Sequence, residues 1–374
     1  MSSIFLVAGE SSGDIHGANL VRALRELRPG WRMEGLGGRR MEAAGMALRH
    51  DLAGEGIMGF AEVLRHLLPI RRLFLDTVAR LREERPAVLV LIDYPGFNLR
   101  LAAEAKKLGI PVVYYVSPQV WAWKKRRIHT IARVVDKMLV IFPFEEDIYR
   151  AVGVPCAYVG HPLADHIGAL PAMEAAGKEG EWLVGLLPGS RGQEIRRIAP
   201  VMFETARAML REHPGLRFAV PCVSRESAGL VRELAGGLPV EICVDGMRGV
   251  LSRARLCLVA SGTATLETAL YGVPMLILYK TSAVTYWIAK RVVKIPHIGI
   301  VNILTGRGIV PEFIQHEASA GKVLPDALRL LGDTPERRAM LGELEAVRER
   351  LGGGGASARA AREIIETAEG AGRG

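Results

Sequence analysis

Residues 87–98 read AVLVLIDYPGFN, in which an apolar run ends at an aspartate and a Pro-Gly turn follows. The run at 87–92 has the length and apolar character of a buried strand, and the turn residues after it end that strand. The same pairing of a short apolar run with a longer segment of helical period recurs in the first part of the chain. The other runs lie at 4–8, 112–116, 137–142 and 157–159. This alternation predicts right-handed βαβ units around a parallel sheet.

A second series of strands is predicted after a break in this alternation. Residues 167–181 read IGALPAMEAAGKEGE, which is rich in small residues and has no strand pattern. Apolar runs resume at 182–187, 217–220, 240–244, 256–260 and 275–279. We therefore predict an α/β protein with two doubly wound, Rossmann-like domains at 1–170 and 180–325, followed by C-terminal helices over 326–374. A chain of 374 residues is long enough for two domains, and a cleft between them is the expected working site.

The composition is that of an ordinary globular protein. Hydrophobic residues make up 49% and charged residues 24% of the chain, which excludes disordered and fibrous classes. The longest uncharged stretch, 108–123, contains two prolines and a glutamine, so no membrane-spanning helix is expected. The N-terminus shows no secretion leader, so we expect a cytoplasmic protein. The net charge of +9 favours an anionic partner: a nucleic acid, a phosphorylated metabolite or an acidic lipid surface.

No metal site is predicted. The four cysteines are far apart and form no Cys-x-x-Cys pair, and no histidine cluster has the spacing of metal ligands. Such cysteines in a cytoplasmic protein are expected to be buried free thiols.

The loops after the strands are where an open parallel sheet binds its ligands. The first reads GESSGD at 9–14, and its glycines and hydroxyls at a helix start suit a sugar or a phosphate bound by backbone N–H groups. The alternative is an ordinary turn whose Ser or Asp caps the helix. The loop is not Gly-x-Gly-x-x-Gly, and the chain has no P-loop sequence, which disfavours dinucleotide oxidoreductases and P-loop nucleotidases.

The second loop carries a candidate general base. Asp93 directly follows the strand at 87–92, and a carboxylate at a strand's carboxyl end is well placed to take a proton from a substrate hydroxyl. The alternative is that Asp93 only caps the turn formed with Pro95 and Gly96.

The third and fourth loops suit a nucleotide diphosphate. The third reads LPGSRGQE at 187–194, where the backbone donors of Gly189 and Ser190 and the planar guanidinium of Arg191 could bind phosphate oxygens. The fourth reads SGTATLE at 261–267. It offers backbone N–H groups at Gly262, Thr263 and Ala264, and one turn later the carboxylate of Glu267, which could accept both ribose hydroxyls. The alternative for Glu267 is a favourable acid in a helix's first turn.

Eight ordered blocks resemble one enzyme family. They are GESSGD at 9–14, MGFAEVL at 58–64, IDYPGFN at 92–98, SPQVWAW at 117–123, GHPLAD at 160–165, LLPGSRGQEI at 186–195, SGTATLE at 261–267 and NILTGRGIVPEFIQ at 302–315. In these blocks the chain is similar to the lipid-A-disaccharide synthases, inverting glycosyltransferases of the GT-B fold. The family commonly has Ala where this chain has Ser11, and often an acidic residue where it has Gly96.

The resemblance implies substrates and partners. The donor would be UDP-2,3-diacylglucosamine and the acceptor 2,3-diacylglucosamine 1-phosphate, giving a β(1→6)-linked disaccharide 1-phosphate and UDP without a cofactor. The 1–170 domain would bind the acceptor and face the membrane, and the 180–325 domain would bind the donor. The reaction would take place on the cytoplasmic face of the inner membrane of Gram-negative bacteria, where the enzyme associates peripherally with anionic lipid. A homodimer is left open.

The resemblance also assigns roles to residues. Asp93 would be the base, Arg191 a contact to the diphosphate and Glu267 a contact to the ribose. The further active-site members it implies are Ser12, Asn302, Glu10 and His16. No Asp-x-Asp sequence occurs, which argues against a sugar-nucleotide transfer bridged by a metal ion.

One helical segment is suited to a lipid surface. Its main apolar stripe, at 63, 67, 70, 74, 78 and 81, is normal for packing on a sheet. A second apolar group, Leu64, Leu68 and Leu75, lies beside it near Arg71 and Arg72. This arrangement indicates insertion at a membrane interface with attraction to anionic lipid. The alternative is a wide core stripe with a solvated basic edge.

Two other functions remain as alternatives. A UDP-sugar 2-epimerase would share the fold and the UDP site but would need no lipid-facing surface. A basic module that binds nucleic acid or membrane would account for the charge. However, the basic residues are scattered and no aromatic-rich RNA motif occurs, so we expect no nucleic-acid partner.

Overall fold

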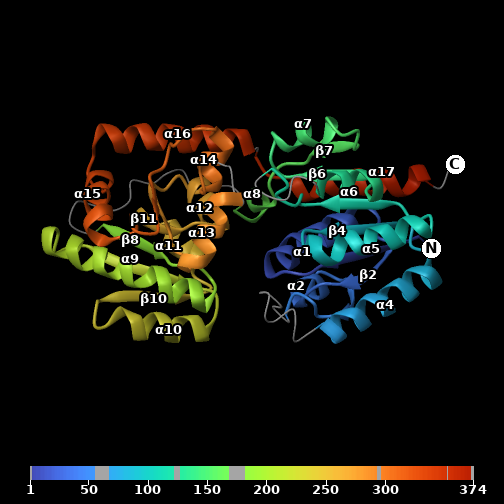
Figure 1. The fold of residues 1–374 in the computed structure, drawn as a ribbon, viewed down its shortest axis with the longest axis horizontal. Helices are drawn as coiled ribbons and strands as arrows, with labels where there is room; N and C mark the ends of the chain where they lie inside the picture. The colour runs from blue at the N-terminus through green and yellow to red at the C-terminus, as the bar shows by residue number, and fades with distance from the viewer. Residues whose placement is uncertain are drawn as a thin grey trace. The chain divides into compact units, whose positions relative to one another are not determined.

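The computed structural model describes residues 2–54, 67–121, 127–167, 182–292, 296–351 and 353–371. These residues form two compact units (Figure 1). The first unit comprises Met1–His166 and Gly354–Gly374, and the second comprises Ile167–Gly353. Among the described residues, no helix is both long and apolar enough to cross a membrane.

The first unit is built on a seven-stranded parallel sheet of order β3-β2-β1-β4-β5-β6-β7. Its strands are β1 (Ser3–Ala8), β2 (Arg32–Leu36), β3 (Ala47–His50), β4 (Val88–Ile92), β5 (Val112–Tyr115), β6 (Lys137–Val140) and β7 (Cys156–Tyr158). Its helices are α1 (Ser11–Leu27), α2 (Arg39–Ala43), α4 (Leu67–Glu84), α5 (Pro95–Lys107), α6 (Arg127–Val134), α7 (Glu145–Arg150), α8 (Pro162–Ile167) and α17 (Ala356–Ala371). The strand order runs outward in both directions from β1 and β4, so right-handed crossovers cover both faces of the sheet.

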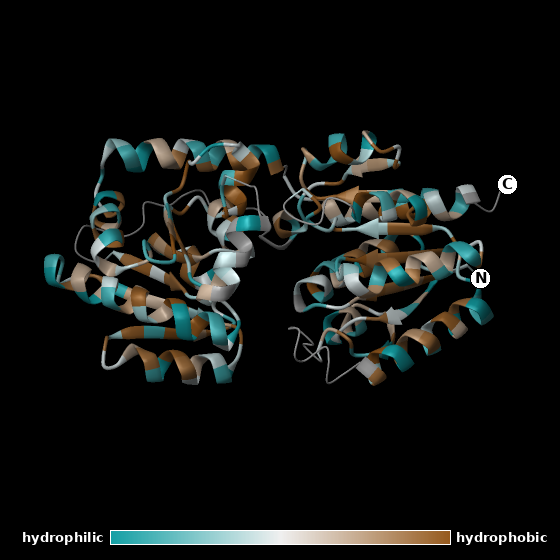
Figure 2. Cartoon of the chain, in the orientation of Figure 1, coloured by the Kyte–Doolittle hydropathy of each residue, from teal (hydrophilic) through white to brown (hydrophobic). Residues whose placement is uncertain are grey.

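The second unit repeats this plan with a six-stranded parallel sheet of order β10-β9-β8-β11-β12-β13. Its strands are β8 (Leu183–Leu187), β9 (Arg217–Cys222), β10 (Val240–Val244), β11 (Ala254–Ala260), β12 (Met275–Tyr279) and β13 (Glu312–Ile314). Its helices are α9 (Gly192–Glu212), α10 (Arg225–Ala235), α11 (Met247–Leu251), α12 (Thr263–Leu270), α13 (Ala283–Val292), α14 (Ile300–Thr305), α15 (Ala320–Leu331) and α16 (Pro335–Leu351). Figure 2 shows the predominantly hydrophobic strands of both sheets.

The predicted apolar runs agree with ten of these strands to within two residues at either end. The strands β2, β3 and β13 were not predicted, because they are short and contain charged residues. In β2, Glu34 has a buried side chain, and its carboxylate accepts hydrogen bonds from Arg49 (2.7 Å) and Arg80 (3.2 Å). Arg32 of the same strand also pairs with Glu34 (3.3 Å), but Arg49 and Arg80 come from other parts of the chain, so the sequence of β2 alone does not show that Glu34 is buried.

The last helix, α17, packs against α1 in the first unit. The Asp165 carboxylate caps its first turn by accepting the backbone N–H groups of Ala356 (2.8 Å) and Ser357 (2.7 Å). The Arg359 guanidinium donates to the carbonyl oxygen of Val159 (2.8 Å). The predicted C-terminal helices are therefore divided, since α15 and α16 belong to the second unit and α17 to the first.

Candidate functional site

Each sheet has one position where the strand order reverses, and ligands of open α/β sheets bind beside the carboxyl ends of the strands there. In the first unit this position lies between β1 and β4, which pair in parallel. The loops that leave it are 9–14 and the turn at Asp93. In the second unit it lies between β8 and β11, and the loops that leave it are 188–192 and 261–264. Four of the predicted loops therefore form two adjacent pairs, one pair in each unit.

Asp93 lies at the end of β4 in a constrained backbone. Asp93 and Tyr94 both have left-handed conformations, with φ of 47° and 46°, and Pro95 begins α5. Such conformations cost free energy in residues other than glycine and cluster at functional sites. The Asp93 carbonyl oxygen accepts hydrogen bonds from the Asn98 amide and from the Tyr114 hydroxyl. The surrounding fold thus fixes the position from which the partly buried Asp93 side chain projects.

The carboxyl group of Asp93 is electrostatically perturbed. Burial raises its pKa from 3.8 to about 6, and the negative charge of Glu10 in the loop after β1 adds to this effect. A hydrogen bond from the Tyr94 backbone offsets part of the shift. A base with a pKa near the working pH is effective, because it is ionised yet retains a driving force for accepting a proton.

The loop at 9–14 packs directly on the Asp93 turn. A Cβ added to Gly9 would lie 2.2 Å from Cδ1 of Tyr94, so only glycine fits there. Glu10 is the N-cap residue of α1, and Ser12 is partly buried in the first turn. Asp14 has a structural role, because its carboxylate accepts the backbone N–H groups of Arg40 (3.2 Å) and Met41 (3.0 Å) at the start of α2.

The two buried histidines of this region lie close together. The ring centroids of His16 and His161 are 6.3 Å apart in an edge-to-face arrangement. Burial lowers the pKa of His161 to about 3, and the neighbouring His16 contributes in the same direction. His161 is therefore neutral at physiological pH, and its Nδ1 accepts the backbone N–H of Leu163 (3.2 Å).

The loop after β5, which contains part of the SPQVWAW block, carries a polar cluster. Val116 has φ of 64°, an outlier for a β-branched residue. The Ser117 hydroxyl lies 2.6 Å from that of Tyr149, and the Trp121 indole donates to the Glu145 carboxylate at 3.2 Å. Burial raises the pKa of Glu145 to about 7. Because β5 pairs with β4, the loop that follows β5 is the neighbour of the turn at Asp93, and this cluster helps to fix that loop.

The loop after β8 combines a required glycine with an exposed cation. Gly189 has φ of 106°, and a Cβ on it would lie 2.1 Å from Oε2 of Glu194. The Glu194 carboxylate accepts the backbone N–H of Ser190 (3.3 Å), and burial raises its pKa. Arg191 is exposed immediately before α9. The loop thus presents a guanidinium beside a helix N-terminus, an arrangement suited to an anion.

The loop after β11 lies beside it. Gly262 precedes α12, whose first residues Thr263 and Ala264 present backbone N–H groups at the helix start. One turn later, burial raises the pKa of Glu267 from 4.5 to about 7. The Ser261 hydroxyl donates to the carbonyl oxygen of Ile298 (3.0 Å), which connects this loop to the segment before α14.

Asn302 is fully buried in α14, and its side chain holds together neighbouring segments. Its amide donates to the Val310 carbonyl oxygen (2.8 Å) and to Glu312 (2.7 Å), and its oxygen accepts the Val310 N–H (3.0 Å). Glu312 also accepts the N–H groups of Ile298 (3.0 Å) and Gly299 (2.9 Å). Asn302 thus supports the segment that contacts Ser261.

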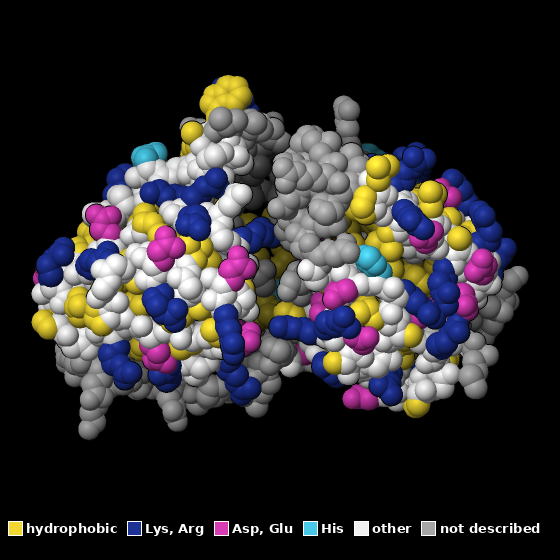
Figure 3. Space-filling model, turned by 90° about the horizontal axis from the view of Figure 1, so that it is seen from below, with side chains coloured by type: hydrophobic (Ala, Val, Ile, Leu, Met, Phe, Trp, Pro, Cys, Tyr) yellow, Lys and Arg dark blue, Asp and Glu magenta, His cyan; other side chains and the backbone are white. Residues whose placement is uncertain are grey.

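Helix α4 has apolar side chains on two sides. Ile70 and Phe74 pack against the core of the first unit. Leu68 and Leu75 are 76% and 55% exposed. The exposed residues Arg71 and Arg72 lie between them in sequence, whereas Leu64 lies outside the described residues. Figure 3 shows the molecule from the side on which α4 lies in Figure 1. On this face of the first unit, hydrophobic side chains reach the surface beside Lys and Arg.

The cysteines and the surface charge agree only in part with the sequence analysis. All four cysteines are free, but only Cys222 and Cys257 are buried, whereas Cys156 and Cys243 are partly exposed. Within the described ranges no group of three or more His, Cys, Asp or Glu side chains could hold a metal ion. On the face that Figure 3 shows, Lys and Arg are interspersed with Asp and Glu on both units.

Known protein families match almost the whole chain. A family model described as lipid-A-disaccharide synthetase matches residues 4–358. The lipid-A-disaccharide synthase of Trichlorobacter lovleyi is 43% identical over 373 residues, which cover 98% of this chain and 97% of the relative. That of Geobacter sulfurreducens is 42% identical over 370 residues, covering 97% and 96%.

Solved structures with the same fold are more distant in sequence. The glycotransferase of kitacinnamycin has a TM-score of 0.66 at 17% identity and covers 98% of each chain. The UDP-GlcNAc 2-epimerase of Neisseria meningitidis, solved with UDP-GlcNAc bound, has a TM-score of 0.65 at 11% identity and covers 97% of this chain and 99% of its own. These likenesses show the GT-B fold of two Rossmann-like units and nothing more specific.

Proposed function

Because this chain belongs to the lipid-A-disaccharide synthase family, glycosyltransferases of lipid A biosynthesis, we propose that it joins UDP-2,3-diacylglucosamine to 2,3-diacylglucosamine 1-phosphate. The products are a β(1→6)-linked disaccharide 1-phosphate and UDP. The first unit binds the acceptor and the second unit binds the donor. The observation that carries this division is the exposed guanidinium of Arg191 beside a helix start at the second unit's switch point, because the loops at 9–14 and 93–96 in the first unit contain no Lys or Arg.

Asp93 is the general base in this proposal. Its carboxylate accepts the proton of the acceptor's 6-hydroxyl as the hydroxyl oxygen forms a bond to the donor's anomeric carbon. The bond from that carbon to the UDP oxygen breaks on the opposite face, so the configuration inverts through an oxocarbenium-like transition state. The raised pKa of Asp93 and its fixed position at the end of β4 support this role. Ser12, Glu10 and His16 line the same end of the sheet.

The leaving diphosphate gains negative charge in the transition state. Arg191 can donate two parallel hydrogen bonds to its oxygens, and the backbone N–H groups at the starts of α9 and α12 supply further fixed donors. Glu267 accepts the ribose hydroxyls, a role that requires its ionised form. Asn302 positions the loop next to Ser261 and acts on the donor through that loop.

The acylated substrates require the enzyme to reach a bilayer. Leu68 and Leu75 supply exposed apolar area on α4, and Arg71 and Arg72 supply positive charge beside it. Both features favour binding to the surface of an anionic membrane, here the cytoplasmic face of the inner membrane. Leu64 belongs to the same proposed surface.

The test is to incubate the purified protein with both lipid sugars, with and without a chelator, and to analyse the products by mass spectrometry. We expect the disaccharide 1-phosphate and UDP in equal amounts, at the same rate in both samples. Formation of an epimerised UDP-sugar without disaccharide would instead support the 2-epimerase alternative, which shares only the fold with this chain. A rate that required an added cation would overturn the metal-independent mechanism.

A further inference from the structure

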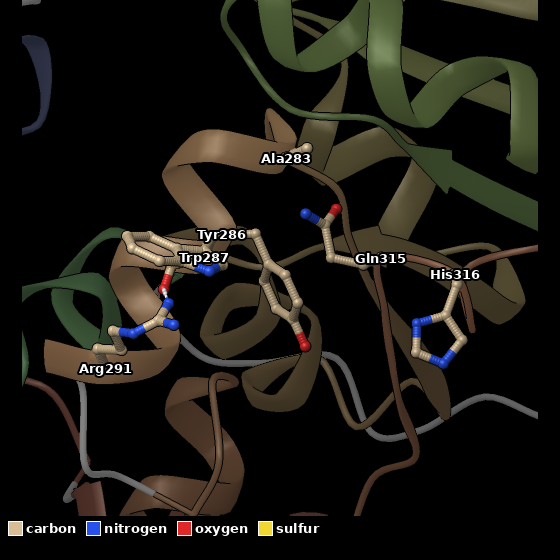
Figure 4. A pocket seen from close by; sticks show the side chains of 6 residues that line it. All are labelled: Ala283, Tyr286, Trp287, Arg291, Gln315 and His316. Atoms are coloured by element: carbon tan, nitrogen blue, oxygen red, sulfur yellow. Dashed lines mark hydrogen bonds between the residues drawn. The ribbon is translucent and has the colours of Figure 1, made fainter.

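The second unit has a pocket that the proposed chemistry does not use. Its volume is about 730 Å³, and it lies between α13 and the segment after β13. It is lined by Ala283, Tyr286, Trp287, Arg291, Gln315 and His316. In Figure 4 the Tyr286 ring points into the space between Trp287 on one side and Gln315 on the other. Trp287 is 59% exposed, a large apolar surface for a soluble unit to leave in water.

Two polar side chains of the lining, those of Gln315 and Arg291, have partners within the protein. The Gln315 amide donates to the carbonyl oxygen of Thr281 (3.2 Å) and accepts its N–H (3.0 Å). The Arg291 guanidinium lies 3.3 Å from the centre of the Trp287 ring and donates to the Trp287 carbonyl oxygen (3.1 Å). The lining is largely apolar, so the pocket is suited to an alkyl group.

The floor of the pocket is held in a strained conformation. Gln315 has φ of 56°, in the left-handed region that residues other than glycine rarely adopt. Its backbone N–H donates to the carbonyl oxygen of Tyr279 (2.8 Å), and its side chain closes on Thr281. Strained residues persist where the surrounding structure fixes them and are concentrated at ligand sites. In the sequence, Gln315 is the last residue of the block at 302–315.

The pocket continues the edge at which the diphosphate loops lie. Strands β11, β12 and β13 are consecutive in the sheet, and the Ser261 N–H donates to the Leu278 carbonyl oxygen (3.0 Å). Because parallel strands are about 4.8 Å apart, the pocket begins within roughly 10 Å of the loop at 261–264. Arg291 belongs to its lining, and its positive charge complements an anionic donor.

We propose that this pocket receives an acyl chain of the donor sugar and so contributes to selecting the donor. The inference rests on the proposed function, since it requires a donor whose sugar carries acyl chains. With the diphosphate held at 189–191 and 262–264, the sugar and its chains extend along the sheet edge to β12 and β13. The acyl chain covers the exposed Trp287 side chain and lies against Tyr286 and Ala283. Each methylene buried in this way should raise donor affinity about fourfold.

The test measures dissociation constants for UDP, UDP-N-acetylglucosamine and UDP-diacylglucosamines of increasing chain length. Ala283→Phe fills the pocket from the exposed start of α13, and Trp287→Ala removes one wall. We expect both variants to bind UDP within twofold of wild type and to lose most of the gain in affinity per methylene. The matched control is Glu212→Phe, which adds the same aromatic ring at the exposed end of α9, where the gain per methylene should persist.

Three results would overturn the assignment. One is an unchanged gain per methylene in Ala283→Phe and Trp287→Ala. A second is UDP binding weakened as strongly as binding of the long-chain donor, which would indicate a nucleoside site. A third is loss of binding to donor-free anionic vesicles in these variants, which would indicate that the pocket takes bilayer lipid. If wild-type protein neither bound a UDP-sugar nor formed disaccharide, the proposed function itself would fail.

Discussion

The Asn98 side-chain amide donates a hydrogen bond to the backbone carbonyl oxygen of Asp93 at 2.7 Å. Asn98 is fully buried one turn into α5, and its amide also reaches the carbonyl oxygen of Ile92 (3.3 Å). The Tyr114 hydroxyl donates to the same Asp93 oxygen from β5. The candidate base is thus fixed through its backbone carbonyl group by two side chains from neighbouring elements.

Asn98→Ala should lower both stability and turnover. Loss of the amide leaves a buried carbonyl group with fewer partners, which costs about 1–3 kcal/mol of unfolding free energy. Because Asn98 acts through Asp93, kcat should fall while KM changes little, measured well below the unfolding temperature. Tyr114→Phe removes the other donor to the same oxygen, so the double variant should deviate from additivity in kcat. Unaltered kcat in both single variants would show that Asp93 needs no such support.

Asp93→Asn should reduce kcat by about 10²–10⁴-fold, the usual contribution of a general base. In wild type, kcat/KM should rise with pH through about 6, because only ionised Asp93 accepts the proton. In the variant, kcat/KM should not show this rise with pH. Asp14→Asn is the matched control, since Asp14 caps α2 and should affect stability while the rise at about 6 remains. Near wild-type turnover of Asp93→Asn would remove the residue from the mechanism.

Glu267 should couple donor binding to pH. The ribose hydroxyls donate to its carboxylate, so affinity for UDP-N-acetylglucosamine should increase as pH rises through about 7. Glu267→Gln should weaken that affinity by about 10–100-fold, the cost of a hydrogen bond to a charged group, and abolish the pH dependence. Isothermal titration calorimetry from pH 5.5 to about 8.5 would measure both effects.

The contribution of Glu267 to the free energy of unfolding should fall as pH rises, whereas its contribution to donor affinity should increase. Its folded pKa is raised from 4.5 to about 7, so it contributes stability below pH 4.5 that is lost as pH rises through about 7. Glu267→Gln removes this loss, so the variant should be at least as stable as wild type at pH 8 in urea denaturation. A variant that was less stable there while binding the donor normally would assign Glu267 a structural role.

The combined variant Leu68→Glu, Arg72→Glu should reduce flotation with anionic liposomes, because it removes exposed apolar area and reverses a charge on α4. The control is Leu27→Glu, which changes a 38% exposed leucine at the end of α1 in the same unit and should float as wild type does. Equal flotation of all three proteins would exclude α4 as the membrane surface.

Patterns within consecutive residues are enough to predict the two series of parallel strands and the loops that carry the chemistry. Hydropathy runs mark buried strands because both faces of a parallel sheet are covered, and this signal is local. Since ligands bind beyond the carboxyl ends of such strands, Asp93, Arg191 and Glu267 could be singled out from their positions directly after a run or one helical turn later.

Contacts between residues that are distant in sequence could not be predicted in this way. Glu34 is buried in β2, where Arg49 and Arg80 from other segments pair with its carboxylate in addition to Arg32 of the same strand, and the sequence of β2 does not predict the two distant partners. Asp165 and Ala356 are 191 positions apart, yet their hydrogen bond helps to hold α17 in the first unit. Likewise, the pocket beside Gln315 forms only when β12 and β13 become neighbours. A hydropathy pattern depends only on consecutive residues. The pairing of a buried charge and the formation of a pocket depend on which distant segments the fold brings together.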